Sequence, residues 1–498
     1  MNHILRLSES VYTGLCREVG TPTEVRIRRE VMDTYHLSQR LEHKFYKRVI
    51  KWSGSKSEGF RLSTSDDDFM RWPLDHKVTC ELSLVSFYYQ LIPDTTVILM
   101  ESDDLPPGFT RLNLMSPSSN TIIRSSCEAK NQKLYISSVL FRDGHLSLHK
   151  YNCPTLHTIP HGPCYTHLYE GGEIDVVWCL HSEEWPKNVL PWIQRCRQHN
   201  WPSEIVISEI LIKGFHVVPI GSTPENGEEW RISFSQAEQK LIYSMNHCQF
   251  LCYGLLKIFL TEVINFQNNT PVICSYFTKT IVFWVIQTNN SLTWTPENLL
   301  YCFWACFKLL ISWVRIGNCP NFFIPQNNMF RQKVTGSVQT SLFSQLYDLY
   351  CKGISCLLLS QTMRPYLSFA ILNGTSILKI CTLARESCIR CKRKGGQEQE
   401  NAVEEIPHEQ HQQQDAEVDH VDEDKSMRSV EDRQIPRRST RERRKPTWMN
   451  NQEYVFTQQH SLEWKKKCEF LHDLKKSQEM RKYEDEIVRT MLDILKNN

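Results

Sequence analysis

The sequence lacks a strong charge of either sign. Its 498 residues carry 58 Lys and Arg against 56 Asp and Glu, a formal net charge of +2. This near balance excludes a chain that is drawn as a whole to nucleic acid or to a membrane, so any such attraction must come from local patches. The hydrophobic share of 41% and the charged share of 23% are typical of a globular protein.

Long uncharged apolar runs are also missing. The most apolar stretch, LLYCFWACFKLLISWV at 299–314, is short for a membrane span and carries Lys308 near its middle, so we expect a buried core helix and no membrane partner. The opening residues MNHILRLSES contain no basic flank followed by an apolar run, and no signal peptide is expected. We therefore expect a cytoplasmic protein, with the nucleus as the alternative.

Paired metal-binding cysteine motifs are absent too. The 19 cysteines are irregularly spaced, which favours reduced thiols in an intracellular protein. Cys388 and Cys391 form one CxxC without a second pair nearby, so surface thiols are favoured over a zinc site.

The folded part of the chain is expected to be α/β (α+β). Residues 27–51 have a helical pattern, and 52–220 contain β-branched stretches such as HKVTCELSLV, QKLYISSVLF and EIDVVWCL. Helical patterns dominate 233–315. We expect five segments: a helical lead-in at 1–50, a mixed α/β domain at 51–230, a helical domain at 231–385, a disordered acidic, Gln-rich and then basic segment at 392–450, and a charged helical tail at 451–498. The tail is a candidate for binding a protein or a nucleic acid.

The most informative stretch is WSGSKSEGFRLSTSDDDFMRW at 52–72. Gly54 and Ser55 form a small turn of the kind that brings amide groups and a hydroxyl to phosphate oxygens. On a strand, Asp66 and Asp68 would share one face and Asp67 the other. Two such carboxylates can bind a pair of magnesium ions. The alternative is a solvated acidic turn.

A third carboxylate would complete such a site. Asp175, in GGEIDVVW, enters an apolar stretch where an unpaired charge is costly. Glu173 lies on the same strand face and is the rival third ligand. A strand-end Asp175 at the surface is the alternative.

These motifs resemble the Mab-21 family, which includes cyclic GMP-AMP synthase and its animal relatives. GSKSEGFRLSTSDDDFM resembles the family's glycine-serine turn and acidic core. HGPCYTHL, EIDVVWCLHSEEWP, GFHVVPIGS, EEWRISFSQAEQKLI, ICSYFTKTIVFW and ENLLYCFWACFKLLISWV with NCPNFFIPQNNMF follow in the family's order. The resemblance runs from about residue 28 to about residue 345. It implies a nucleotidyltransferase sheet with flanking helices at 51–230, a helix-hairpin-helix-like lobe at 231–385, and a nucleotide pocket between them.

The resemblance also assigns roles to single residues. Gly54 and Ser55 match the phosphate-binding turn, and Asp66, Asp68 and Asp175 match the catalytic acids that hold Mg²⁺ or Mn²⁺. The remaining nucleotide-binding matches are Arg231 and Ser233 for the second nucleotide, Lys257 and Ser275 for the triphosphate, and Tyr276 for base stacking. Without the resemblance, helix packing and surface charge would be the preferred interpretation of Arg231, Lys257 and Tyr276.

Two departures from the synthase stand out. No His/Cys insertion follows WRISFS, and His247, Cys248 and Cys252 are too few for a closed tetrahedral site, so no structural zinc is expected. Ile220 stands where the synthase has a lysine, which puts base selection in doubt.

Two functional hypotheses follow. The first is an innate immune enzyme that joins ATP and GTP into a cyclic dinucleotide when double-stranded RNA or DNA binds. The second is a catalytically silent module of the same fold that binds nucleotides or proteins in development or regulation.

Overall fold

The computed structural model describes residues 2–62, 67–91, 95–154, 157–169, 172–266, 272–331 and 333–372. These residues belong to one unit of the chain. The segments expected at 392–450 and 451–498 lie outside the described residues, as do Cys388, Cys391 and Asp66.

Two helices, α1 (Asn2–Glu18) and α2 (Pro22–Tyr46), open the chain. The mixed α/β part then contains thirteen strands and six α-helices among the described residues. The strands are β1 (Arg48–Ser53), β2 (Asp67–Pro73), β3 (His76–Thr79), β4 (Thr96–Glu101), β5 (Phe109–Leu114), β6 (Cys127–Lys130), β7 (Lys133–Ile136), β8 (His157–His161), β9 (Cys164–Tyr169), β10 (Gly172–Trp178), β11 (Leu180–Ser182), β12 (Phe215–Val218) and β13 (Glu229–Ser233). The helices are α3 (Gly54–Ser57), α4 (Leu82–Leu91), α5 (Thr121–Ser125), α6 (Ser138–Asn152), α7 (Leu190–His199) and α8 (Glu204–Lys213).

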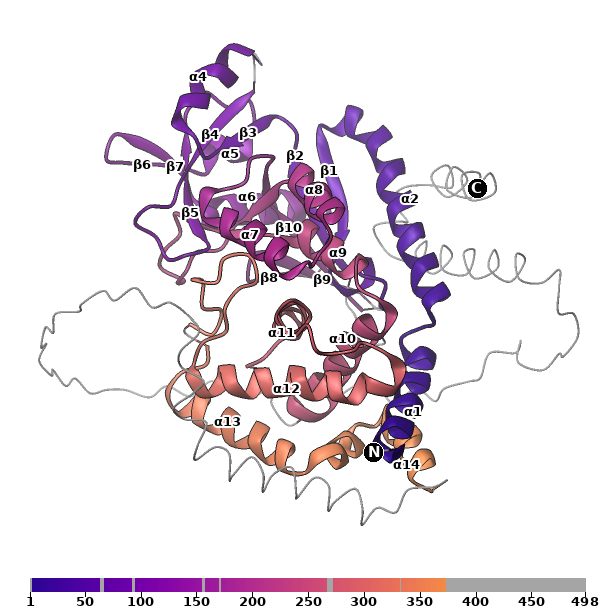
Figure 1. Cartoon of the computed structure of the whole chain (residues 1–498). Helices are drawn as coiled ribbons and strands as arrows, with labels where there is room; N and C mark the ends of the chain where they lie inside the picture. The colour runs from indigo at the N-terminus through magenta and orange to yellow at the C-terminus, as the bar shows by residue number, and fades with distance from the viewer. Residues whose placement is uncertain are drawn as a thin grey trace, which may run out of the picture. The chain divides into compact units, whose positions relative to one another are not determined.

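Helices dominate from residue 235 onward. They are α9 (Ser235–Tyr243), α10 (His247–Phe259), α11 (Ser275–Thr288), α12 (Leu299–Ile316), α13 (Gly336–Cys351) and α14 (Arg364–Leu372). Figure 1 shows the sheets gathered on one side and α10 to α14 on the other, with α1 and α2 running alongside both. The expected α/β class with a following helical part is therefore confirmed.

Two sheets organise the first part. One has the strand order β1-β2-β10-β9-β8, in which β2 and β10 are parallel and the other pairs are antiparallel. The other runs β11-β12-β13-β5-β4-β3, with β7 joined to β5 and β6. The first sheet positions the acidic residues, because its central strands β2 and β10 carry Asp68 and Asp175.

The helical pattern expected through residue 51 is wrong at its end. Helix α2 stops at Tyr46, and Arg48–Ser53 forms the strand β1. Ile50 and Trp52 are buried on alternate positions of β1, where they pack on the α2 residues Val31 and Tyr35. Alternation over six residues is a strand period, and it prevails over the charged helical pattern before it.

Local chemistry explains where the helical part divides. The long helical pattern from 235 to 264 breaks between α9 and α10 because Asn246 caps α10. Its side chain accepts from the amide of Gln249, and the Gln249 side chain accepts from the amide of Asn246, which makes a capping box.

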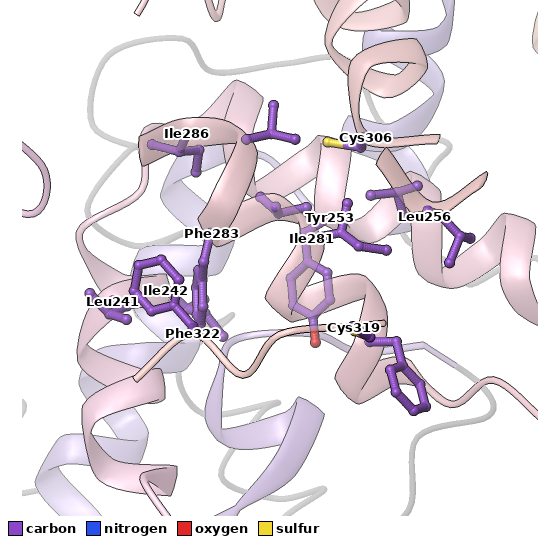
Figure 2. Close-up of a cluster of buried hydrophobic side chains, with 14 of the residues drawn as sticks. Leu241, Ile242, Tyr253, Leu256, Ile281, Phe283, Ile286, Cys306, Cys319 and Phe322 are labelled. Carbon is purple, nitrogen blue, oxygen red and sulfur yellow. The ribbon is translucent and has the colours of Figure 1, made fainter. Parts of the chain in front are cut away.

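One hydrophobic core joins the helical part to the second sheet. Figure 2 shows part of it, where side chains of α9, α10, α11 and α12 meet the segment after α12 that carries Cys319 and Phe322. Trp230 of β13 and Val217 of β12 belong to the same core. The burial of both sheet and helix residues in one cluster holds the two parts together.

Two segments are apolar and long enough by composition to cross a membrane, His247–Ile264 and Pro296–Ile316. Within the described chain, 72% of the first and 50% of the second is buried in protein. The second contains the stretch expected as a core helix, and Leu300, Phe303 and Phe307 are fully buried there. Such burial is typical of core helices.

Candidate functional site

The glycine-serine turn lies directly against the acidic strand. Strands β1 and β2 pair so that Ser53 is opposite Asp68, and the short helix α3 starts at the next residue, Gly54. Gly54 has a φ of +62°, and a Cβ placed on it would lie 1.7 Å from Asp68 Oδ2. Only glycine therefore allows the turn to approach this carboxylate so closely.

Asp68 and Asp175 are neighbours across the sheet. They are register partners on the parallel strands β2 and β10. Burial, with smaller effects of the Asp175 and Asp68 charges, raises the pKa of the Cys164 thiol to about 12. Asp175 is held in place because Thr166 donates to its Oδ1 at 2.5 Å, and His161 Nδ1 lies 3.8 Å from its Oδ2.

The rival third acid, Glu173, does not pair with the described part of β2. Glu173 is exposed at the start of β10 and pairs with Leu168 of β9. Among the described residues, β2 begins at Asp67, opposite Ile174, so Glu173 has no partner there. The geometry therefore brings Asp175, and not Glu173, beside Asp68.

The expected alternation of the acidic run is visible for two of its three members. Asp68 is half-buried beside Gly54, while Asp67 is buried and paired with Lys56 at 2.5 Å. Asp66 lies outside the described residues. Within the described ranges, no group of three His, Cys, Asp or Glu side chains is close enough to hold a metal ion. The site therefore presents two carboxylates, with the third position untested.

Lys257 meets the turn from the helical part. It is buried on α10, and its ammonium donates to Ser55 Oγ. The ammonium also lies 5.0 Å from the centre of the Phe60 ring and 5.3 Å from that of Tyr253. Ring faces attract cations at such distances, so the two rings help to position the ammonium. Two of the residues expected to contact phosphate are thus in direct contact.

The remaining expected residues line the neighbouring elements. Arg231 and Ser233 lie on β13, opposite Val218 and His216 of β12. Arg231 is exposed, and its charge opposes the rise in the pKa of both the Cys164 thiol and the Tyr276 phenol. Ser275 is exposed at the first position of α11.

Tyr276 follows Ser275 and is held at its hydroxyl. That group donates to Glu238 Oε1 at 2.9 Å and accepts from Asn321 Nδ2 at 3.2 Å. Burial and the Glu238 charge raise the pKa of Tyr276 well above its ordinary value, so the phenol stays protonated. The fixed hydroxyl sets the orientation of the ring.

A buried ion group beside the turn was not predicted from the sequence. Lys279 lies 2.6 Å from Glu58 Oε1 and 3.1 Å from Glu238 Oε2. Burial alone would lower the pKa of Lys279, but the two carboxylates raise it well above its ordinary value. Glu58 directly follows α3, and Glu238 holds Tyr276, so the group links the turn to the ring. The sequence holds one indication of this group: Lys279 follows Tyr276 by three residues, so both lie on one face of a helix.

The three residues considered for zinc lie on α10, as expected for a core helix. His247 Nε2 lies 3.8 Å from Cys16 Sγ, and Cys248 donates to the carbonyl of Thr295. Cys252 is fully buried. Ile220, which stands where the synthase has a lysine, makes apolar contacts. Its side chain packs on a small cluster that includes Met70 and Val218.

Comparison with known proteins matches two successive domains. Residues 92–244 match the Mab-21 protein nucleotidyltransferase domain, and residues 248–348 match the Mab-21 protein HhH/H2TH-like domain. Asp175, Arg231 and Ser233 lie in the first match, and Lys257, Ser275 and Tyr276 in the second. Gly54, Ser55 and Asp68 precede both.

Three curated relatives illustrate the similarity. Cyclic GMP-AMP synthase of Mus musculus is 28% identical over 201 residues, covering 35% of this chain and 38% of the mouse protein. Cyclic GMP-AMP synthase-like receptor of Magallana gigas is 27% identical over 188 residues, covering 34% of this chain and 31% of the oyster protein. Protein mab-21-like of Drosophila melanogaster is 22% identical over 174 residues, covering 33% of this chain and 44% of the fly protein.

The chain thus aligns with less than half the length of each of these relatives. The two domain matches are consecutive, and they follow the order of the sheets and the helical part. On this ground the chain belongs to the Mab-21 family of proteins with a nucleotidyltransferase domain.

Proposed function

We propose that this chain is a metal-dependent nucleotidyltransferase that joins ATP and GTP into a cyclic dinucleotide when a double-stranded nucleic acid binds. The observation that carries the proposal is the register of Asp68 and Asp175, which lie side by side next to the Gly54–Ser55 turn. Its supports are the nucleotidyltransferase domain match and the similarity to two proteins named for cyclic GMP-AMP synthesis.

The residues present fit a divalent cation. Mg²⁺ and Mn²⁺ prefer carboxylate oxygens, and the neighbouring Asp68 and Asp175 supply them. Asp175 is oriented by Thr166, as outer contacts commonly orient metal-binding carboxylates. When bound, the cations would promote loss of the ribose hydroxyl proton and neutralise charge on the transferred phosphate.

The protein side chains have separate tasks in this proposal. Ser55 and the turn amides bind the triphosphate, and Lys257 neutralises part of its charge from the opposite side. The Tyr276 ring, fixed through Glu238 and Asn321, stacks on a base. Arg231 reaches the second nucleotide from β13. Because these groups come from both parts of the fold, they would hold the two nucleotides in one fixed orientation.

The test is a product assay on the purified full chain. Labelled ATP and GTP are supplied with Mg²⁺ or Mn²⁺ and either double-stranded RNA, double-stranded DNA or no nucleic acid. The proposal expects a cyclic dinucleotide in at least one nucleic-acid arm, and loss of that product in Asp175→Asn. Glu173→Gln is the matched control, because it removes a carboxylate two residues away on the same strand and should retain activity.

Absence of product in every arm, with nucleotide binding intact, would overturn the enzyme proposal. The silent-module hypothesis would then apply. Loss of product in Glu173→Gln with retention in Asp175→Asn would instead move the third acid to Glu173.

A further inference from the structure

Asp67 is a buried carboxylate between two acidic neighbours. It is 3% exposed on β2, where it faces away from Asp68. A carboxylate at this depth costs several kcal/mol unless a cation or hydrogen bonds compensate it. Lys56 supplies that compensation through a 2.5 Å ion pair.

Lys56 belongs to the phosphate turn itself. It is the third residue of α3, which runs from Gly54 to Ser57. The strand therefore contacts the turn twice in succession: Asp68 lies against Gly54, and Asp67 binds Lys56. Two adjacent residues that hold two nearby turn residues restrict both the distance and the rotation of the turn.

Further contacts hold the end of the turn from the helical part. The carbonyl of Ser57 accepts from Gln239 Nε2 at 3.1 Å and from the Tyr243 hydroxyl at 2.8 Å. On the strand side, the turn is held by the Lys56–Asp67 ion pair and by the close approach of Asp68 to Gly54.

We propose that Lys56 and Asp67 form a positioning pair, which fixes the Gly54–Ser55 turn against the carboxylate of Asp68 so that phosphate and metal are bound at a set separation. This inference rests on the proposed function. In this assignment Lys56 binds the carboxylate of Asp67 on β2, although a lysine in a phosphate-binding turn commonly contacts phosphate. Asp67 then serves as an anchor for the turn, while the adjacent acid faces the site.

The competing explanation is stability alone, and the chain offers a control for loss of a lysine ion pair away from the turn. Lys77 of β3 makes a 2.7 Å ion pair with Glu183, and its side chain is 30% exposed against 33% for Lys56, although Glu183 is exposed where Asp67 is buried. The variants are Lys56→Met, Asp67→Asn, both together, and Lys77→Met. Asp67→Asn keeps the side-chain shape, so it tests the pair even if Lys56→Met fails to fold.

Three measurements distinguish a positioning role of the pair from a purely stabilising one. They are the melting temperature, the affinity for a non-hydrolysable ATP analogue with Mn²⁺, and the hydrogen exchange of the amides at 54–60. The single variants should bind the analogue about tenfold more weakly and exchange at 54–60 about tenfold faster, while Lys77→Met changes neither. The double variant should regain melting temperature, because it leaves no unpaired buried charge, yet keep the weak affinity and fast exchange.

Recovery of affinity and slow exchange in the double variant would overturn the proposal, as would wild-type values in Asp67→Asn. The result is separable from that of the product assay. If the wild type makes no product, the proposed function fails, whereas exchange at 54–60 still decides whether the pair fixes the turn.

Discussion

Asp68 and Asp175 lie opposite one another on the parallel strands β2 and β10, although a long stretch of chain separates them. Adjacent parallel strands are about 4.8 Å apart, so two side chains on one face at one register fall within reach of a shared cation. The Gly54 turn contacts the first of these carboxylates, and Thr166 holds the second. The following predictions test how each neighbour contributes.

Gly54→Ala should abolish most activity. A Cβ would collide with Asp68 Oδ2, and the φ of +62° would add strain of about 1–2 kcal/mol. Misplacement of the carboxylate should lower product formation about a hundredfold. Gly336→Ala is the control, because its φ is +55° and nothing lies within 4 Å of its Cβ. Equal activity losses in the two variants would show that strain alone is responsible.

Lys257→Met should act on nucleotide affinity. The methionine retains the apolar packing near Phe60 and Tyr253 but removes the ammonium that donates to Ser55. A charged hydrogen bond contributes about 1.5–3 kcal/mol, so the dissociation constant for ATP should rise roughly 10- to 100-fold. Binding measured by calorimetry checks this, with the part-exposed Lys240→Met as the control. Unchanged affinity would remove Lys257 from the triphosphate site.

Lys279→Met should destabilise the fold. It would leave the buried carboxylates of Glu58 and Glu238 without their shared cation. Breaking such a group costs about 3–5 kcal/mol. The exposed Lys308→Met should change stability by less than about 0.5 kcal/mol. Chemical denaturation of both variants gives the comparison, and adding Glu58→Gln to Lys279→Met should recover part of the loss. A loss no larger than that of Lys308→Met would mean that the ion group contributes little.

His145 should make the fold sensitive to acid. It is buried on α6, it stacks on Trp178 at 4.1 Å, and its Nε2 has no hydrogen-bond partner in the described part of the chain. Burial, with a smaller effect of Arg71, lowers its pKa to about 3. The unfolded chain therefore binds a proton near pH 6.5 that the folded chain does not, and stability falls as pH decreases below that value.

The expected size of this effect is about 1.4 kcal/mol per pH unit between roughly pH 6 and pH 4. His145→Phe should make the fall with pH less steep by about that amount, whereas exposed His157→Phe should not. Denaturation midpoints measured from pH 7 to pH 4.5 provide the check. Equal slopes in the wild type and His145→Phe would contradict the assignment.

The sequence predicts some of these features well. EIDVVWCL covers all of the strand β10 except its first residue, and the apolar stretch at 299–314 lies within the core helix α12, because each has a clear period or length. The secondary structure of short segments was predicted less accurately. Of HKVTCELSLV, only His76–Thr79 is a strand, and Leu82–Leu91 is the helix α4. Residues 48–51 are strand, in keeping with the burial of Ile50 and Trp52 on alternate positions. The packing of α2 on these two side chains is a tertiary contact that the charged helical pattern does not contain.

The candidate site also has some features that the sequence predicts and others that it does not. The turn and the acidic run were recognisable because the residues are contiguous. The register of Asp68 with Asp175 depends on strand order, and the Lys279 ion group depends on how α9 and α11 pack. Neither follows from spacing along the chain. The sequence offered Asp175 as a charge entering an apolar stretch, with Glu173 as its rival, and the family resemblance matched Asp175 to the third acid.

The central claim is that Asp68 and Asp175 act as one metal-binding pair. The most direct measurement is Mn²⁺ binding to the wild type, Asp68→Asn, Asp175→Asn and Glu173→Gln in the presence of a non-hydrolysable ATP analogue, with product formation followed in parallel. The account predicts that Mn²⁺ affinity falls at least tenfold in each Asp variant, that product falls about a thousandfold, and that Glu173→Gln matches the wild type. Wild-type Mn²⁺ affinity in both Asp variants would contradict it.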